Sequence, residues 1–128
     1  MNAKAATAIV AAILTTSLAI AQKVVNVKPG SPDYKVVIQQ VSPFVVDQVH
    51  YALKLDGATM RRWKDWIFMF SPVTPTDSAS HPKASVAAIL RKGRKWTIRE
   101  ITMGSSALED IEADWQKRYK LPDALLKK

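Results

Sequence analysis

The sequence predicts an α+β domain. Along the chain, an N-terminal helix comes first, a four-stranded antiparallel meander sheet follows, and a C-terminal helix comes last, with both helices packed on one face of the sheet. Three observations favour this fold. An apolar stripe at helical spacing opens the domain, short apolar or alternating runs separated by turn residues follow, and a second helical stripe closes it. Because both helices would cover the same face, we expect the other face to be partly wet or covered by a partner.

The first helix is predicted to begin at residues 31–33, where a serine cap is followed by proline at the first helical position and an acid in the first turn. Pro43 is predicted to break or kink this helix, because proline removes a backbone hydrogen bond and clashes with the preceding turn. A second short helical piece is then expected over residues 44–48. The apolar stripe consists of Tyr34, Val37, Ile38 and Val41.

Strands are expected over residues 51–56, 66–70, 84–90 and 95–102. The stretch 61–65 is polar and turn-like, and the stretch 71–82 holds three prolines and is predicted to be a loop. A tight turn over residues 91–94 joins the last two strands, with Gly93 supplying a positive φ. The tryptophans Trp66, Trp96 and Trp115 are expected to fill the core.

The closing helix is predicted from the spacing of Leu108, Ile111, Trp115 and Tyr119, which places these side chains on one apolar face. Acidic residues lie near its start and basic residues near its end, an arrangement that suits the helix dipole. Pro122 is expected to end the helix.

The N-terminal residues 1–21 are typical of a secretory signal peptide. Lys4 precedes an apolar run that ends in small residues at the −3 and −1 positions of a cleavage site after Ala21. An uncleaved membrane anchor is the alternative, since about 20 apolar residues span a bilayer. Residues 22–30 are then an N-terminal tether and residues 31–128 a single α+β domain, which we expect to be periplasmic or secreted.

The composition limits the kinds of partner. The chain has a net charge of +8 at pH 7 and no cysteine, which excludes disulfides and lipid attachment through a cysteine. A basic exported protein is suited to anionic lipid, acidic polysaccharide or an acidic protein, including peripheral contact with a membrane, whereas the ordinary alternative is that the charge only maintains solubility. Export argues against a nucleic-acid partner.

The candidate site consists of basic residues in two predicted turns. In a meander, the turn between the first two strands lies at the same end of the sheet as the turn between the last two, so the cations would gather at one rim. The ordinary alternative is that hairpin turns are solvated and often contain lysine and arginine. The predicted anion- or partner-binding residues are Arg61, Arg62, Trp63, Lys64, Arg91, Lys92, Arg94 and Lys95, with the rings of Trp63 and Trp96 available to stack or anchor at an interface.

No catalytic motif, metal-ligand spacing or phosphate loop stands out. His50 and His81 lie far apart in the sequence without an accompanying carboxylate pattern, so we expect no metal site and no cofactor. Glu100 and an acid of the last helix would support acid–base chemistry if they were buried together, but acids at a helix start more often serve the dipole. We therefore expect a protein that is not an enzyme.

Three stretches together resemble a family of small exported bacterial proteins, mostly without an assigned function. They are residues 31–35 (SPDYK), residues 64–68 (KDWIF), and residues 95–98 (KWTI) followed by 115–122 (WQKRYKLP). The match covers most of the domain and depends on packing aromatics and turn residues. Asp65 departs from the family pattern, which often has glycine there. The resemblance implies the α+β architecture and carries over no catalytic residue.

Two functions follow as hypotheses. The first is a non-enzymatic periplasmic binding protein, such as an inhibitor, immunity or adaptor protein, that engages a protein partner or an anionic envelope component through the basic turns. The second is a small α+β enzyme or small-ligand binder with a pocket between the helices and the sheet, with Glu100 as the acid of the pocket.

Overall fold

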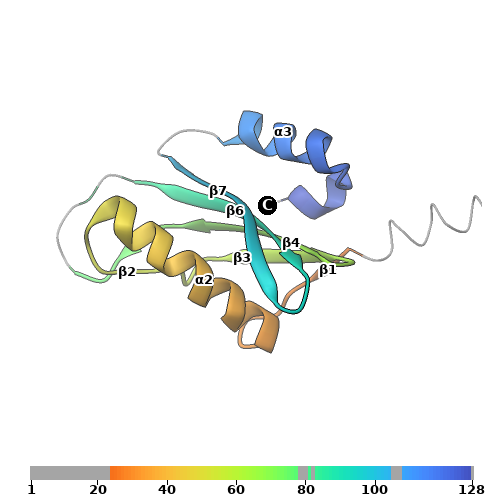
Figure 1. Cartoon of the computed structure of the whole chain (residues 1–128). Helices are drawn as coiled ribbons and strands as arrows, with labels where there is room; N and C mark the ends of the chain where they lie inside the picture. The colour runs from red at the N-terminus through yellow and green to blue at the C-terminus, as the bar shows by residue number, and fades with distance from the viewer. Residues whose placement is uncertain (1–23, 78–80, 82, 105–107, 128) are drawn as a thin grey trace, which may run out of the picture.

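The computed structural model of the chain describes residues 24–77, 81, 83–104 and 108–127 (Figure 1). The predicted signal peptide, residues 1–21, lies outside the described residues. The elements, in chain order, are β1 (Val25–Asn26), α2 (Pro32–Val49), β2 (Leu53–Lys54), β3 (Thr59–Trp63), β4 (Trp66–Pro72), β5 (Thr74–Pro75), β6 (Ser85–Lys92), β7 (Trp96–Gly104), α3 (Glu109–Tyr119) and the 3₁₀ helix η1 (Asp123–Leu126).

The main sheet has five strands in the order β1-β3-β4-β6-β7, and every neighbouring pair is antiparallel. The predicted α+β class and the meander are confirmed, with β3, β4, β6 and β7 as its four strands. β1 adds a fifth strand, formed by two residues of the predicted tether that pair with Arg61 and Arg62. β2 and β5 make a separate two-stranded sheet.

The first strand of the meander lies later in the chain than the sequence predicts. The expected strand over 51–56 contains only the short β2, whereas the expected turn over 61–65 is mostly β3. The turn itself is two residues long, Lys64 and Asp65. β3 carries little periodic signal because Met60 is its one fully buried side chain and the two arginines that follow are held by other elements.

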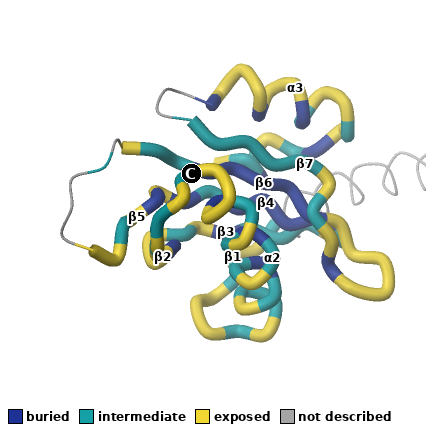
Figure 2. The backbone as a smooth tube through the Cα atoms, turned by 60° about the vertical axis from the view of Figure 1, so that its left-hand side comes forward, coloured by how far each residue is buried: buried dark blue, intermediate teal, exposed yellow. Residues whose placement is uncertain are grey.

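The two helices lie on opposite faces of the main sheet, as Figure 1 shows with α2 below the sheet and α3 above it, so the expectation that both pack on one face is wrong. Successive residues of β4 alternate between the two faces: Ile67 and Met69 pack toward α2, while Trp66 and Phe68 pack toward α3 and η1. Neither face is left for water over residues 66–69 of β4 and 86–90 of β6, and the buried centre of the sheet is visible in Figure 2.

Each face has its own hydrophobic cluster. On the α2 face, the helix contributes Val37, Val41 and Val45. On the α3 face, Trp115 of α3 and Leu125 of η1 pack on the sheet, and Leu125 is fully buried. The C-terminal segment after α3 therefore folds back to cover the sheet. The predicted core role of Trp66, Trp96 and Trp115 is confirmed, since each is at most 6% exposed.

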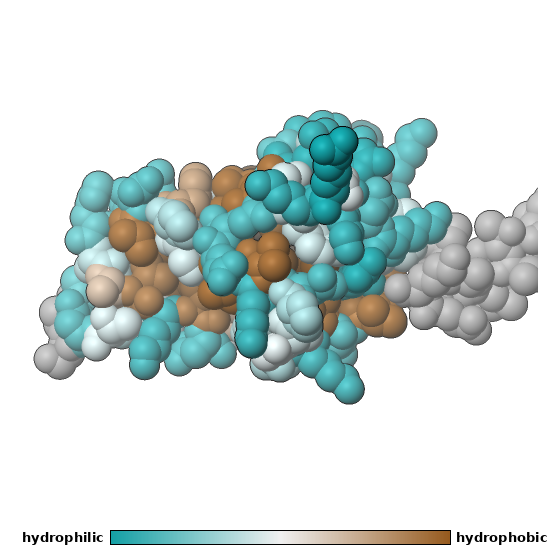
Figure 3. Space-filling model, turned by 60° about the horizontal axis from the view of Figure 1, so that its bottom comes forward, coloured by the Kyte–Doolittle hydropathy of each residue, from teal (hydrophilic) through white to brown (hydrophobic). Residues whose placement is uncertain are grey.

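Helix α2 is continuous from Pro32 to Val49, so the break predicted at Pro43 does not occur. Pro43 is exposed, and its ring lies on the solvent side of the helix, where water can hydrogen-bond a backbone carbonyl that loses its amide partner. Ser31 caps the helix as predicted, its hydroxyl accepting from the amide of Tyr34 at 3.4 Å. Figure 3 views the α2 side and shows apolar groups interspersed among hydrophilic ones.

Helix α3 is rotated relative to the predicted apolar stripe. Ile111 is 40% exposed, whereas the neighbouring Glu112 is only 5% exposed. The helix ends at Tyr119, with Lys120 in the left-handed conformation, before Pro122 is reached. Among the described residues, neither α2 nor α3 is long and apolar enough to cross a membrane.

Candidate anion-binding site at the hairpin turns

The structure places the β3–β4 and β6–β7 turns side by side at one end of the main sheet, near the start of α2 (Figure 1). The backbone amide of Lys92 donates to the carbonyl of Asp65 at 2.8 Å, which joins the two turns directly. We call this region the hairpin rim and define it as Lys64, Asp65 and residues 91–95. Its position agrees with the antiparallel geometry from which the candidate site was predicted.

The backbone conformations of the two turns differ from those that the sequence predicts. Lys64 has a positive φ of 54°, a conformation that costs a side-chain-bearing residue about 1 kcal/mol or more. Gly93, which was expected to supply a positive φ, does not lie in the left-handed region. Its amide instead donates to the carbonyl of Lys95 at 3.1 Å. The tight two-residue turn thus needs the unusual conformation, and the longer turn does not.

Arg61 and Arg62, two of the predicted site residues, lie in β3 and are already engaged. The Nη1 of Arg61 donates to the carbonyl of Ala124 at 3.1 Å and ties η1 to the sheet. The Nη1 of Arg62 donates to Asp33 Oδ2 at 2.9 Å, and its Nε donates to the carbonyl of Lys64 at 3.1 Å. Both side chains therefore hold the fold together rather than point freely from the rim.

The tryptophans near the rim contribute to packing. Trp96 is 3% exposed, and its Nε1 donates to Asp33 Oδ1 at 3.0 Å, so its ring is not available to stack on a partner. Trp63 is half-buried, with the ammonium of Lys64 4.8 Å from its ring centroid. The guanidinium of Arg62, which also binds Asp33, lies 5.2 Å from the centroid of the Trp96 ring.

Asp33 links α2 to the rim, because one oxygen accepts from Arg62 and the other from Trp96. We expect Asp33→Asn to lower the free energy of unfolding by about 1–3 kcal/mol, since an amide cannot accept at both positions and the buried indole N–H or the guanidinium loses its partner. Urea unfolding followed by tryptophan fluorescence measures this loss. Asp47→Asn, an exposed acid of the same helix, is the matched control and should change stability by less than about 0.5 kcal/mol. Equal effects of the two substitutions would contradict the bridging role of Asp33.

A depression of about 350 Å³ lies at the rim on the α3 side of the sheet. Arg99 and Thr97, which sequence reasoning did not include, line it together with residues of both turns. Strand alternation predicts Thr97 beside the rim once the β6–β7 turn is placed correctly. Arg99 reaches the same side through a β-bulge near Ile98, and this bulge has no clear sequence signal. The lining residues are Asp65, Arg91, Lys92, Gly93, Thr97 and Arg99.

Arg91 is the best-oriented cation of this depression. Its Nε donates to Asp65 Oδ2 at 3.2 Å, and its guanidinium lies 5.3 Å from the centroid of the Trp66 ring. Lys92, by contrast, turns to the other face, with its ammonium 5.7 Å from the Trp96 ring. Arg94 and Lys95 are exposed at the tip of the turn, and no ion pair joins either of them to another described residue.

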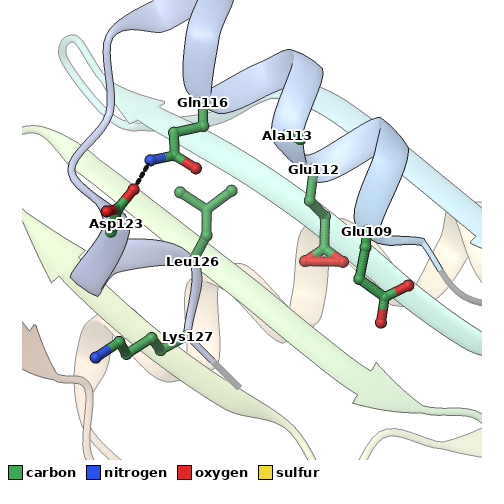
Figure 4. Close-up of a pocket in the computed structure, with 7 residues that line it drawn as sticks. All are labelled: Glu109, Glu112, Ala113, Gln116, Asp123, Leu126 and Lys127. Atoms are coloured by element: carbon green, nitrogen blue, oxygen red, sulfur yellow. Dashed lines mark hydrogen bonds between the residues drawn. The ribbon is translucent and has the colours of Figure 1, made fainter.

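A second depression, of about 370 Å³, lies between α3 and η1. Figure 4 shows Glu112 pointing from α3 into this space, with Gln116 donating to Asp123 at its edge. The buried position of Glu112 was missed, because an acid in the first turn of a helix normally faces solvent and serves the dipole. Acidic Glu109 and basic Lys127 also line the depression.

Glu100 does not line either depression. Its Oε1 accepts from Arg118 Nη1 at 2.6 Å and from the hydroxyl of Tyr119 at 2.9 Å, so it fastens α3 to the edge strand β7. Hydrogen bonding to Asp114 raises the pKa of Arg118, and attraction to Glu100 acts in the same direction. Glu100 thus pairs with a cation of the last helix, and the condition for acid–base chemistry, burial together with an acid of that helix, is not met.

The two histidines are well separated from the rim. His50 ends α2 in the left-handed conformation, and His81 stacks on Tyr51 with ring centroids 3.8 Å apart. Within residues 24–77, 81, 83–104 and 108–127, no group of three or more acidic, histidine or cysteine side chains is placed to hold a metal ion.

Comparison with known proteins finds no family model, no curated protein and no solved structure that matches this chain. The resemblance to small exported bacterial proteins therefore stays a prediction, and the hairpin rim is the feature of the molecule that bears on function.

Proposed function

We propose that this protein is an exported, periplasmic binding protein without enzymatic activity, which engages an anionic partner of the cell envelope through its hairpin rim, as an inhibitor, immunity or adaptor protein would. The proposal depends on one observation: two turns lie side by side at the rim, and together they contain far more basic than acidic side chains. The exposed cations without an ion pair to a described residue are Lys64, Lys92, Arg94 and Lys95, whereas Arg91 pairs with Asp65, the one carboxylate among the rim residues.

The rim is held rigidly, which favours recognition over general solvation. Asp33 ties α2 to the rim strands, and the Lys92–Asp65 backbone hydrogen bond fixes one turn against the other. A turn whose backbone is already fixed loses less conformational entropy when a partner binds than a flexible loop does. Charges gathered at one end of a small molecule also steer an anionic partner toward that end.

The test is reversal of the four exposed rim cations in the quadruple variant K64E/K92E/R94E/K95E. Binding to poly-L-glutamate and to vesicles containing phosphatidylglycerol should weaken at least about tenfold, because exposed ion pairs contribute about 0.2–1 kcal/mol each. The matched control K35E/K54E/K83E/K117E changes the net charge equally at exposed positions elsewhere and should keep most of the binding. Microscale thermophoresis and vesicle sedimentation give the two affinities.

A pull-down from a periplasmic extract with the same two variants extends the test to a protein partner. A stoichiometric partner that is captured by the natural chain and the control but lost with the rim variant would support the proposal. Equal capture or equal anion binding by both quadruple variants would overturn it, because the charge would then act without regard to position.

A further inference from the structure

The depression beside the hairpin rim differs from the rest of the basic surface in being concave and in presenting two guanidinium groups. Arg91 and Arg99 line it from neighbouring strands β6 and β7, whereas the ammonium of Lys92, another lining residue, turns away toward the Trp96 ring. Asp65 is the one acid in the lining, and it is already engaged with Arg91. Two guanidinium groups and one carboxylate leave a net positive charge at the depression.

The guanidinium of Arg91 is oriented before any ligand arrives. Asp65 fixes its Nε edge at 3.2 Å, and the ring of Trp66 supports its plane. Its terminal nitrogens, Nη1 and Nη2, donate to no other described residue. A guanidinium held in this way offers a pair of parallel N–H donors, which is the geometry that binds two oxygens of one anion.

Arg99 supplies a second guanidinium fork, that is, a second pair of parallel N–H donors, at the depression. Its side chain is exposed and makes no hydrogen bond or ion pair with another described residue. The hydroxyl of Thr97 donates to the carbonyl of Arg91 at 3.3 Å, so it shapes the floor of the depression and is not needed as a donor to the ligand. Two guanidinium groups present two separate pairs of N–H donors, and the three terminal oxygens of a phosphoryl group offer each pair two oxygens with only one shared, whereas both pairs would have to share the two oxygens of a single carboxylate.

We infer that this depression binds one phosphoryl group in its dianionic form, with Arg91 and Arg99 as the two contacting forks. The inference rests on the proposed function, because it names the chemistry of the anion that the rim engages. A phosphomonoester has three terminal oxygens and a charge near −2 above its second pKa of about 6, so it offers acceptors to both guanidinium groups and the opposite charge to each of them. A volume of about 350 Å³ accommodates the phosphoryl group and part of the molecule that bears it.

Free phosphate and the phosphate of a lipid or sugar share this chemistry, so the test includes each source. Titration calorimetry with inorganic phosphate and with glycerol 3-phosphate measures the isolated group, and glutarate is the carboxylate control. Vesicles with phosphatidic acid, a monoester, are compared with vesicles of phosphatidylglycerol, a diester. We expect phosphate and glycerol 3-phosphate to bind and glutarate to bind at least tenfold more weakly. Stronger binding to phosphatidic acid than to phosphatidylglycerol would assign the group to a lipid, and equal vesicle binding would assign it to a soluble phosphate.

Charge-conserving variants separate the fork geometry from simple attraction. Arg91→Lys and Arg99→Lys should each weaken phosphate binding at least tenfold, because an ammonium cannot form the bidentate contact. Arg118→Lys, at an exposed position of α3 that lines neither depression, is the matched control and should bind within twofold of the natural chain. Phosphate binding should also strengthen as the pH rises from about 5.5 to about 7.5, since the dianion forms over that range.

The inference is overturned if millimolar phosphate does not bind, if glutarate binds as well as phosphate, or if both arginine-to-lysine variants in the depression bind phosphate like the natural chain. These outcomes are distinct from failure of the proposed function. Rim-dependent binding to poly-L-glutamate that persists without phosphate binding would leave the proposed function in place and remove only the phosphoryl site.

Discussion

Introducing a carboxylate at Ala87 should unfold the protein, and introducing one at its neighbour Ala88 should do the same. Both side chains are completely buried, Ala87 in the cluster toward α3 and Ala88 in the cluster toward α2. A buried unpaired carboxylate costs several kcal/mol even after relaxation, and the extra atoms overpack each cluster. This cost is comparable with the total stability of a small domain, about 5–15 kcal/mol.

Far-UV circular dichroism and thermal unfolding of Ala87→Asp and Ala88→Asp measure this effect. Ala52→Asp, at an exposed position before β2, is the matched control and should fold with nearly unchanged stability. A sheet with both helices on one face would tolerate one of the two alanine substitutions. A well-folded Ala87→Asp or Ala88→Asp protein would therefore argue against the coverage of both faces.

The face of the sheet on which each helix packs is the main feature of the fold that the sequence prediction gets wrong, although the sequence contains a signal for it. The residues of β4 and β6 form nearly continuous apolar runs, and such runs are typical of strands buried on both faces. A strand with one wet face would alternate apolar and polar side chains. The runs were identified correctly as strands, and their lack of alternation already indicated a second covering layer.

Strand β3 shows why other parts could not be read from the sequence. Its arginines look like turn residues, but Arg61 is satisfied by a carbonyl of η1 and Arg62 by an acid in α2, both far away in the chain. Only the folded structure brings these partners together. The meander still brought the two basic turns to one end of the sheet, because that consequence depends on the number of antiparallel strands and not on the position of the first.

In α3 the helix itself was predictable, but its rotation was not. The stripe at helical spacing included Ile111, which is exposed, and passed over Glu112, which is buried between α3 and η1. The helix turns this way because η1 folds back beneath it, and Leu125 occupies the space against the sheet. A short 3₁₀ helix after a proline has no periodic pattern from which this packing could be predicted.

Replacing Phe68 by alanine should lower the free energy of unfolding by about 3–5 kcal/mol. Phe68 is 1% exposed at the centre of β4 and belongs to the cluster that holds α3 and η1 on the sheet. Removing its ring leaves a cavity that the flanking strands β3 and β6 cannot close, because their hydrogen bonds fix the strand spacing. Denaturant unfolding measures the loss, and an unchanged slope with denaturant shows that the surface exposed on unfolding is the same.

Phe70→Ala is the matched control, because Phe70 lies two residues further along the same strand and on the same face but is only half-buried. Its loss should cost less than that of Phe68, since less apolar surface is removed from the protein interior. The comparison tests whether α3 and η1 are held mainly over the middle of the sheet, where Trp66 and Phe68 meet Trp115 and Leu125. A larger cost at Phe70 than at Phe68 would place the main contact nearer the far end of β4 and contradict this packing.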